Sequence, residues 1–151
     1  MLTKQKPMVL KGQLPLKNLY TAGLAGNDFL HALKKGEILS SACHACGTTY
    51  VPARYFCERC FENISQNYKS VSPQGELVSW TGCYVGLNGK RSSTPAVVGA
   101  IRLYGASTVF VHFLKVPKAN LRTGLKVQAV FKPESKRVGS ILDISYFAPA
   151  K

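Results

Sequence analysis

The sequence has few of the residues from which catalytic sites are usually built. Its 151 residues include 7 acidic side chains and 3 histidines. The acids Glu76, Glu134 and Asp143 fall in different predicted strands or turns, so they offer no carboxylate pair for acid–base catalysis. A pairing of Cys83 with His112 is conceivable, but the sequence does not position it, and we expect Cys83 to be a buried or half-buried structural thiol. These shortages predict a chain that is not an enzyme by itself.

Long apolar runs are also missing. No stretch approaches the ~20 consecutive apolar residues of a membrane helix. The N-terminal stretch MLTKQKPMVLKGQLPLK is basic but lacks the apolar centre of a secretory signal. The composition, 46% hydrophobic and 18% charged, is that of a globular protein. We therefore expect a cytoplasmic protein without a membrane partner.

The shortage of acids leaves a formal net charge of +13, spread along the chain without a basic tail. A charge of this size favours nucleic acid, an acidic protein face or a phosphate-bearing ligand such as coenzyme A as partner. The alternative is that the charge only keeps the protein soluble.

One short segment, CHACGTTYVPARYFCERC, contains two C-x-x-C pairs that are ten residues apart, Cys43 with Cys46 and Cys57 with Cys60. Disulfides would need an oxidising compartment, and a redox C-x-x-C usually occurs singly. Two pairs at this separation are typical of a tetrahedral four-thiolate zinc site, which has no open position for a substrate. The segment predicts one structural Zn²⁺ ion held by all four thiolates.

The residues that follow the two pairs differ. Gly47 can adopt the positive φ with which the first turn closes, whereas Phe61 follows the second pair, so we expect a less regular second turn. Between the pairs we expect a short hairpin with residues 48–51 as its first arm.

Upstream of the cysteines, residues 27–39 have the pattern of a helix. Asn27 or Asp28 can cap its start and Gly36 can end it. Its apolar face, which includes Phe29, can pack on its own domain or dock on another subunit, and both interpretations stay open.

Downstream, five runs have the alternation and turn signals of β-strands: 75–86, 95–105, 107–114, 125–132 and 140–148. Pro117 and Gly124 can open and close a helical turn between the third and fourth runs. This order suits an OB-fold barrel, although an SH3-like barrel or a meander has similar periodicity. We expect a mainly β protein: an arm and helix over 1–39, a rubredoxin-like zinc ribbon over 40–65 and a five-stranded OB-fold barrel over 66–151, with 61–74 as a linker.

This arrangement resembles the thiolase-associated zinc-ribbon/OB-fold proteins, long catalogued as a domain of unknown function. The resemblance covers roughly residues 20–149 and rests on the stretches YTAGLAGNDFLHALKKGEIL, CHACGTTYVPARYFCERC, GELVSWT, PAVVGAIRL, LKVQAVFKPE and SYFAPA. The chain departs from the family at Ala53 and Glu58, where proline is common; these changes affect local turns and not the metal ligands.

The resemblance implies a non-catalytic subunit that supports a thiolase-fold large subunit and its acyl-CoA site in a hetero-oligomer. The nearest functional picture is the small subunit of a two-component thiolase, such as benzoylsuccinyl-CoA thiolase. Residues that we expect to contact coenzyme A or the partner are Arg54, Lys90, Arg91 and Phe29.

An alternative function is single-stranded nucleic-acid binding, because zinc ribbons and OB barrels also occur together in such proteins. The aromatic residues that this would use are Trp80, Tyr84, Tyr104, Phe110 and Phe113. They alternate with aliphatic residues as barrel-core residues do, and the basic residues are scattered, so we favour the subunit over a nucleic-acid binder. A free-standing acyl-CoA-binding protein is a third possibility.

Overall fold

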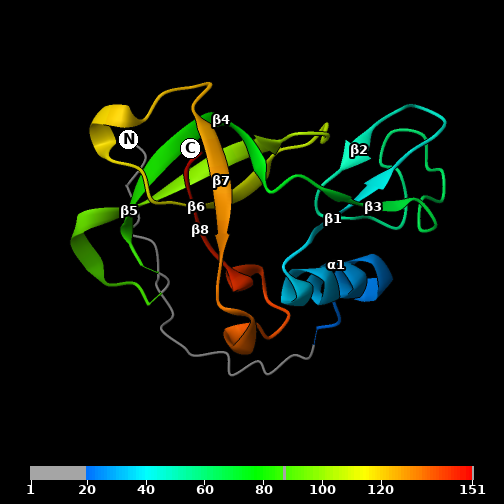
Figure 1. Ribbon diagram of the computed structural model, residues 1–151, viewed down its shortest axis with the longest axis horizontal. Helices are drawn as coiled ribbons and strands as arrows, with labels where there is room; N and C mark the ends of the chain where they lie inside the picture. The colour runs from blue at the N-terminus through cyan, green and yellow to red at the C-terminus, as the bar shows by residue number, and fades with distance from the viewer. Residues whose placement is uncertain (1–19, 87, 151) are drawn as a thin grey trace, which may run out of the picture.

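One helix precedes two β-sheets in the computed structural model (Figure 1), which describes residues 20–86 and 88–150. The first sheet has one strand from the cysteine segment and two strands that flank it, and the second sheet closes into a barrel. The predicted class, mainly β with a helix, a zinc-ribbon region and an OB-fold barrel, is confirmed. Residues 1–19 of the predicted arm lie outside the described residues. None of the described helices is long and apolar enough to cross a membrane.

Helix α1 spans Gly23–Lys35 and begins earlier than the sequence indicated. The predicted cap at Asn27 or Asp28 was wrong, because both lie inside the helix; Ala22 occupies the N-cap without a side-chain hydrogen bond. The predicted end is confirmed, since Gly36 takes the left-handed conformation (φ 86°) that its missing Cβ permits.

The first sheet has the order β2-β1-β3, with β1 at Ile38–Ala42, β2 at Thr49–Tyr50 and β3 at Tyr68–Val71. The predicted hairpin between the two cysteine pairs was wrong: β2 pairs back with β1, across the first pair. Residues 61–74, expected as a linker, contain β3, which pairs with β1. The ribbon sheet is therefore completed by residues on both sides of the cysteine segment.

The second sheet is a closed barrel of order β4-β5-β6-β8-β7. Its strands are β4 Gln74–Val85, β5 Arg91–Leu103, β6 Phe110–Leu114, β7 Lys126–Phe131 and β8 Ile144–Pro149. The short helix η1, Lys118–Asn120, lies between β6 and β7 as predicted, after Pro117 and before Gly124. Because β6 pairs with β8 in parallel, the sheet is not a meander but the partly Greek-key barrel of the OB fold.

Strands β4 and β5 extend past the barrel as a two-stranded hairpin. Among the described residues, β7 pairs with β4 only at residues 74–76, and β6 pairs with β5 only at residues 97–101. The remainder of the two strands, up to the pair Val85–Arg91, has no third strand beside it. This green hairpin projects at the left of Figure 1.

A single apolar cluster joins the helix, the ribbon and the barrel. Phe29 of α1 is 3% exposed, and its ring centroid lies 6.3 Å from that of Phe110 in β6. Val51 and Ala53 of the ribbon are buried in the same cluster, with Phe147 of β8. The helix therefore packs on its own domain, which decides between the two interpretations of its apolar face. As a consequence, the Phe29 side chain is part of the core and is not available to a partner surface.

The loop before β8 is held by a buried carboxylate. The backbone N–H groups of Val138, Gly139 and Ser140 donate hydrogen bonds of 2.7–3.2 Å to Asp143 in η3, Ile141–Asp143. Burial acts to raise the pKa of Asp143, but these N–H donors outweigh it and the pKa is lowered. Because η3 also contacts α1, beside which it lies in Figure 1, this carboxylate helps to fix the helix.

We expect Asp143→Asn to lower the free energy of unfolding by about 2 kcal/mol, because the carboxylate that accepts the backbone N–H hydrogen bonds is replaced by a neutral amide. Denaturant titration at neutral pH measures the change, and Glu134→Gln, an exposed acid in η2 (Glu134–Lys136), is the matched control. The stabilisation by Asp143 should be complete above its ordinary pKa of 3.8 and vanish as the pH falls through the lower folded-state pKa. Equal stability of the two variants at neutral pH would contradict this role.

Candidate metal centre

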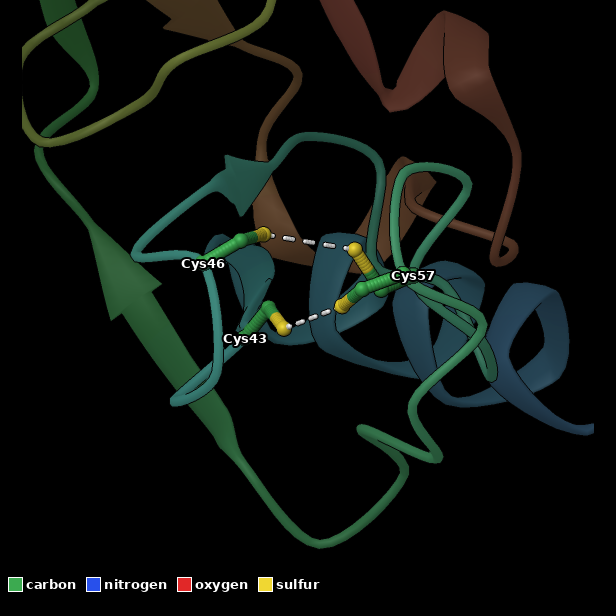
Figure 2. Close-up of side chains that lie close together, drawn as sticks. Cys43, Cys46 and Cys57 are labelled. Carbon is green, nitrogen blue, oxygen red and sulfur yellow. Dashed lines mark hydrogen bonds between the residues drawn. The ribbon is translucent and has the colours of Figure 1, made fainter.

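The four predicted ligands converge on one point. Cys43 and Cys46 lie in the turn between β1 and β2, and Cys57 and Cys60 lie in the next turn of the segment. Their sulfur atoms all lie within 4.8 Å of one another, with Cys43–Cys60 at 3.4 Å and Cys46–Cys57 at 3.5 Å. Figure 2 shows the side chains turned toward the shared centre, with Cys43, Cys46 and Cys57 labelled. A tetrahedral Zn²⁺ with bonds of about 2.3 Å separates its sulfurs by about 3.8 Å, so the cluster fits a four-thiolate ion.

The two cysteine turns have the same backbone structure. The N–H of Gly47 donates to the Cys43 carbonyl at 2.8 Å, and the N–H of Phe61 donates to the Cys57 carbonyl at 2.9 Å. Gly47 has φ 71° and Phe61 has φ 59°. The expectation of a less regular second turn was therefore wrong, because Phe61 takes the left-handed conformation that glycine takes in the first.

Tyr50 of β2 contacts one of the four ligands. Its side chain is fully buried, and its hydroxyl donates to the sulfur of Cys57 at 3.2 Å. This hydrogen bond lowers the pKa of Cys57 to about 6 and raises that of Tyr50 to about 12. The Thr48 hydroxyl, 3.3 Å from the sulfur of Cys46, lowers the pKa of that thiol as well. The lowered pKa values of Cys57 and Cys46 favour the thiolate form, which is the form that binds a metal.

Cys60, the fourth ligand, has a raised rather than a lowered pKa. The N–H of Glu62 acts to lower the pKa of Cys60, but the hydrogen bonds with the thiols of Cys43 and Cys57 raise it to about 12. Neighbouring thiolates repel, so a cluster of four does not ionise completely by itself. A cation at the centre removes this repulsion, which couples metal binding to proton release.

The basic candidates are exposed and lie on different elements. Arg54 forms an ion pair with Glu58, and its guanidinium lies over the Tyr50 ring, 5.0 Å from the centroid. Lys90 and Arg91 lie at the tip of the β4–β5 hairpin. The structure therefore does not bring the three together into one site.

The expectation of a buried Cys83 was wrong, because this thiol is exposed on the projecting hairpin. Cys83 pairs with Ala96 of β5, whereas His112 lies opposite Gly99. Three residues along a strand amount to about 10 Å. His112 is buried, where desolvation lowers its pKa, and its Nε2 lies 3.1 Å from the Ile141 carbonyl oxygen. The two side chains therefore form no nucleophile–base pair.

Sequence reasoning missed a groove on the inner face of the hairpin. It has a volume of about 610 Å³, and its walls include Trp80, Tyr84, Pro95, Val116 and Lys118. Reading the aromatic residues as barrel core was wrong for all but Phe110: Trp80 is 40% and Tyr84 53% exposed, and Tyr104 and Phe113 are also exposed. Strands β4 and β5 extend beyond the residues that pair with β7 and β6, so no described strand of the barrel covers the face of the hairpin that carries Trp80 and Tyr84. The alternation of Trp80, Gly82 and Tyr84 in the sequence places these residues on one face of β4. It does not show whether that face is buried or exposed.

Comparison with known proteins identifies both parts of the chain. Residues 30–63 match the family described as the ChsH2 rubredoxin-like zinc ribbon domain, and residues 68–132 match the ChsH2 C-terminal OB-fold domain. No curated protein matches.

Two solved structures are similar. A protein of unknown function from the DUF35 family of Sulfolobus solfataricus is 29% identical, with a TM-score of 0.58 over 72% of this chain and 78% of that one. A chain of the Ltp2-ChsH2(DUF35) aldolase is 18% identical, with a TM-score of 0.57 over 81% of this chain and 91% of that one, and this likeness concerns the fold.

We expect removal of the metal by a strong chelator to abolish hydrogen-exchange protection in residues 40–65. The apolar cluster around the ligands has four fully or nearly buried members, Cys43, Tyr50, Cys57 and Ile64, which is too little to hold the segment without the ion. Exchange mass spectrometry measures the effect alongside metal content. Cys57→Ser should lose the metal and Cys83→Ser should keep it. Intact protection after verified loss of the metal would contradict this prediction.

We also expect Tyr50→Phe to weaken metal binding by about 10-fold, because partners of metal ligands typically contribute this much. Competition with a chromogenic chelator measures the affinity. Tyr55→Phe removes a hydroxyl that makes no hydrogen bond within the described part of the chain, and it should leave the affinity unchanged. If both variants bind like the parent, the hydrogen bond to Cys57 does not support the centre.

Proposed function

This chain belongs to the ChsH2-type zinc-ribbon and OB-fold proteins of the DUF35 family, and we propose that it is a non-catalytic subunit of a thiolase-type acyl-CoA enzyme complex. The observation that carries the proposal is the presence of both ChsH2 domains in one chain, in the order ribbon then barrel. The Ltp2-ChsH2(DUF35) aldolase supports it, because that protein pairs a chain of this fold with a second component. In this proposal the catalytic groups of the acyl-CoA reaction belong to the large subunit.

The metal in this proposal is Zn²⁺, held by Cys43, Cys46, Cys57 and Cys60 as a structural ion. The spacing of the sulfurs and the match to a zinc-ribbon domain support this choice. Four thiolates complete the coordination, so the ion stabilises the ribbon and polarises no substrate. Cysteines kept reduced for metal binding are usual in a reducing compartment, which suits a complex in the cytoplasm.

The groove of the β4–β5 hairpin is the proposed contact for acyl-CoA. Its walls are mostly apolar and aromatic, with Lys118 at one side, and Lys90 and Arg91 lie at the exposed tip of the same hairpin. An acyl-CoA has an extended amphipathic chain that ends in phosphate groups, which suits an apolar groove with cations beyond it. The large subunit would cover the exposed side, since the groove is open to solvent when the chain is alone.

One observation favours nucleic acid instead. Trp80 and Tyr84 are exposed beside Lys118, and single-stranded binders combine such rings with cations. The presence of both ChsH2 domains favours the subunit over a nucleic-acid binder. Binding of a single-stranded oligonucleotide is therefore one of the outcomes that the test below must exclude.

We expect this chain to co-purify with the thiolase-type protein encoded by a neighbouring gene, and acyl-CoA thiolysis to require the large subunit. In the complex, replacing both Lys90 and Arg91 with alanine should raise KM for acyl-CoA roughly 3- to 10-fold, because two exposed phosphate contacts are lost. Steady-state kinetics measures KM, and Lys136→Ala, an exposed cation in η2, is the matched control.

Three outcomes would contradict the proposal. The first is thiolysis by the isolated chain that disappears in Cys83→Ala. The second is a complete absence of complex with the large subunit. The third is tight binding of a single-stranded oligonucleotide that weakens steeply with salt, as phosphate contacts dictate.

A further inference from the structure

Two aromatic rings and a proline form one apolar surface in the groove of the β4–β5 hairpin. Trp80, Gly82 and Tyr84 alternate along β4, and all three line the groove. The two aromatic side chains are 40% and 53% exposed, so neither belongs to the core. Gly82 is not among the described glycines with positive φ, so the backbone conformation does not require glycine there. The reason for this glycine is the space around it.

Pro95 of β5 packs against β4 at the position of Gly82. A Cβ on Gly82 would lie 3.2 Å from the Cβ of Pro95 and 3.8 Å from Cε2 of Tyr84. The glycine therefore lets both side chains lie close to the strand, and their rings continue the surface that Trp80 begins. We call Trp80, Gly82, Tyr84 and Pro95 the ring site. It lies open to the groove, whose volume is about 610 Å³.

Two parts of an acyl-CoA could fill an apolar groove, namely the pantetheine arm with its acyl group or the adenine ring. Exposed aromatic side chains bind nucleobases by stacking, and they do so whichever base is offered. A flexible pantetheine arm loses more conformational freedom in an open groove than a rigid ring does. The ring site therefore suits adenine better than the arm.

The charges near the ring site are positive. Residues 77–133, which contain every residue that lines the groove, include eight Lys/Arg and no Asp or Glu. Lys118 lies in the groove wall, and Arg91 pairs across the hairpin with Val85, the residue after Tyr84. All the phosphates of coenzyme A are attached to the ribose that carries the adenine, whereas the thioester end is neutral. Cations beside a stacking surface therefore favour the nucleotide end of the ligand.

We propose that the ring site binds the adenine ring of an acyl-CoA, with the ribose phosphates held by Lys118 and Arg91. This inference rests on the proposed function, and it states which end of the ligand this chain holds. The pantetheine arm then leads away from the ring site toward the large subunit, to which the catalytic groups belong. This chain therefore binds the constant part of the substrate and leaves the choice of acyl group to the large subunit.

The test uses the fluorescence of the ring site itself, because Trp80 is the single tryptophan of the chain. The full chain with metal bound is titrated with coenzyme A, with adenosine 3′,5′-bisphosphate and with S-acetylpantetheine, which lacks the nucleotide. Excitation at wavelengths that adenine does not absorb makes the emission specific for the indole. We expect the two nucleotides to quench Trp80, and S-acetylpantetheine to leave its emission unchanged at the same concentrations.

Tyr84→Ala should raise the dissociation constants of both nucleotides about 10-fold, because one stacking surface is lost. Tyr104→Ala is the matched control, since Tyr104 is an exposed tyrosine that follows β5 at the end away from the hairpin tip. Lys118→Ala should weaken both nucleotides and reduce the salt dependence of their binding. All three side chains are exposed, so the unfolding midpoints should stay the same.

A second readout uses the complex with the large subunit. Tyr84→Ala should raise KM about 10-fold for acyl-CoA substrates with short and long acyl groups alike, and it should leave kcat unchanged. The KM for an S-acylpantetheine substrate should not change, because that substrate has no adenine. A change that depends on the acyl group would instead place the acyl end in the groove and overturn the inference.

The remaining outcomes separate the adenine site from the proposed function. If the complex forms and converts acyl-CoA while millimolar coenzyme A leaves Trp80 unquenched, the adenine site is wrong and the proposed function stands. If S-acetylpantetheine quenches as strongly as coenzyme A, or if a single-stranded oligonucleotide binds more tightly than coenzyme A, the adenine site is also wrong. If the isolated chain binds coenzyme A at Trp80 but joins no thiolase-type subunit, the adenine site is supported and the proposed function fails.

Discussion

The convergence of four thiols on one point is the constraint on which the rest of the structure depends. The ligands are 17 residues apart at most along the chain, and the apolar cluster around them has only four buried members. A cluster of that size does not offset the entropy lost when two turns and three short strands become ordered. We expect a metal ion bound by the four thiolates to supply that free energy and so to hold β2 and the Val51–Ala53 segment in place.

The ribbon is connected to the barrel through side chains rather than through a linker. Val51 and Ala53, which lie between the two cysteine pairs, are buried together with Phe29 of the helix and Phe110 of the barrel. The hydroxyl of Thr108, just before β6, also accepts from the Val51 N–H at 2.9 Å and donates to its carbonyl at 3.1 Å. These contacts fix the position of the cysteine segment relative to the barrel wall. A fixed arrangement of ribbon and barrel suits a subunit that binds a partner through its surface.

The surfaces left uncovered are those that a partner would need. The hairpin groove exposes Trp80 and Tyr84, and the second cysteine turn exposes Phe61, whose φ is positive. Scattered apolar residues on a surface are ordinary, but a strained aromatic residue and an apolar groove beyond a barrel are not. In our proposal the large subunit covers the hairpin groove, and the acyl-CoA lies where the hairpin meets that subunit.

The sequence by itself determined the elements whose causes are local. The paired cysteines predicted the ligand set, Gly36 predicted the helix end, and residue alternation predicted five barrel strands, because thiolate spacing, positive φ and strand periodicity act within a few residues. Only the tertiary structure decided the rest. That β3 joins the ribbon, that Phe29 is buried, and that Trp80 and Cys83 are exposed depend on which segments distant in the chain lie beside them. Alternation places Trp80 on one face of a strand, but whether that face is covered depends on where the neighbouring strands end.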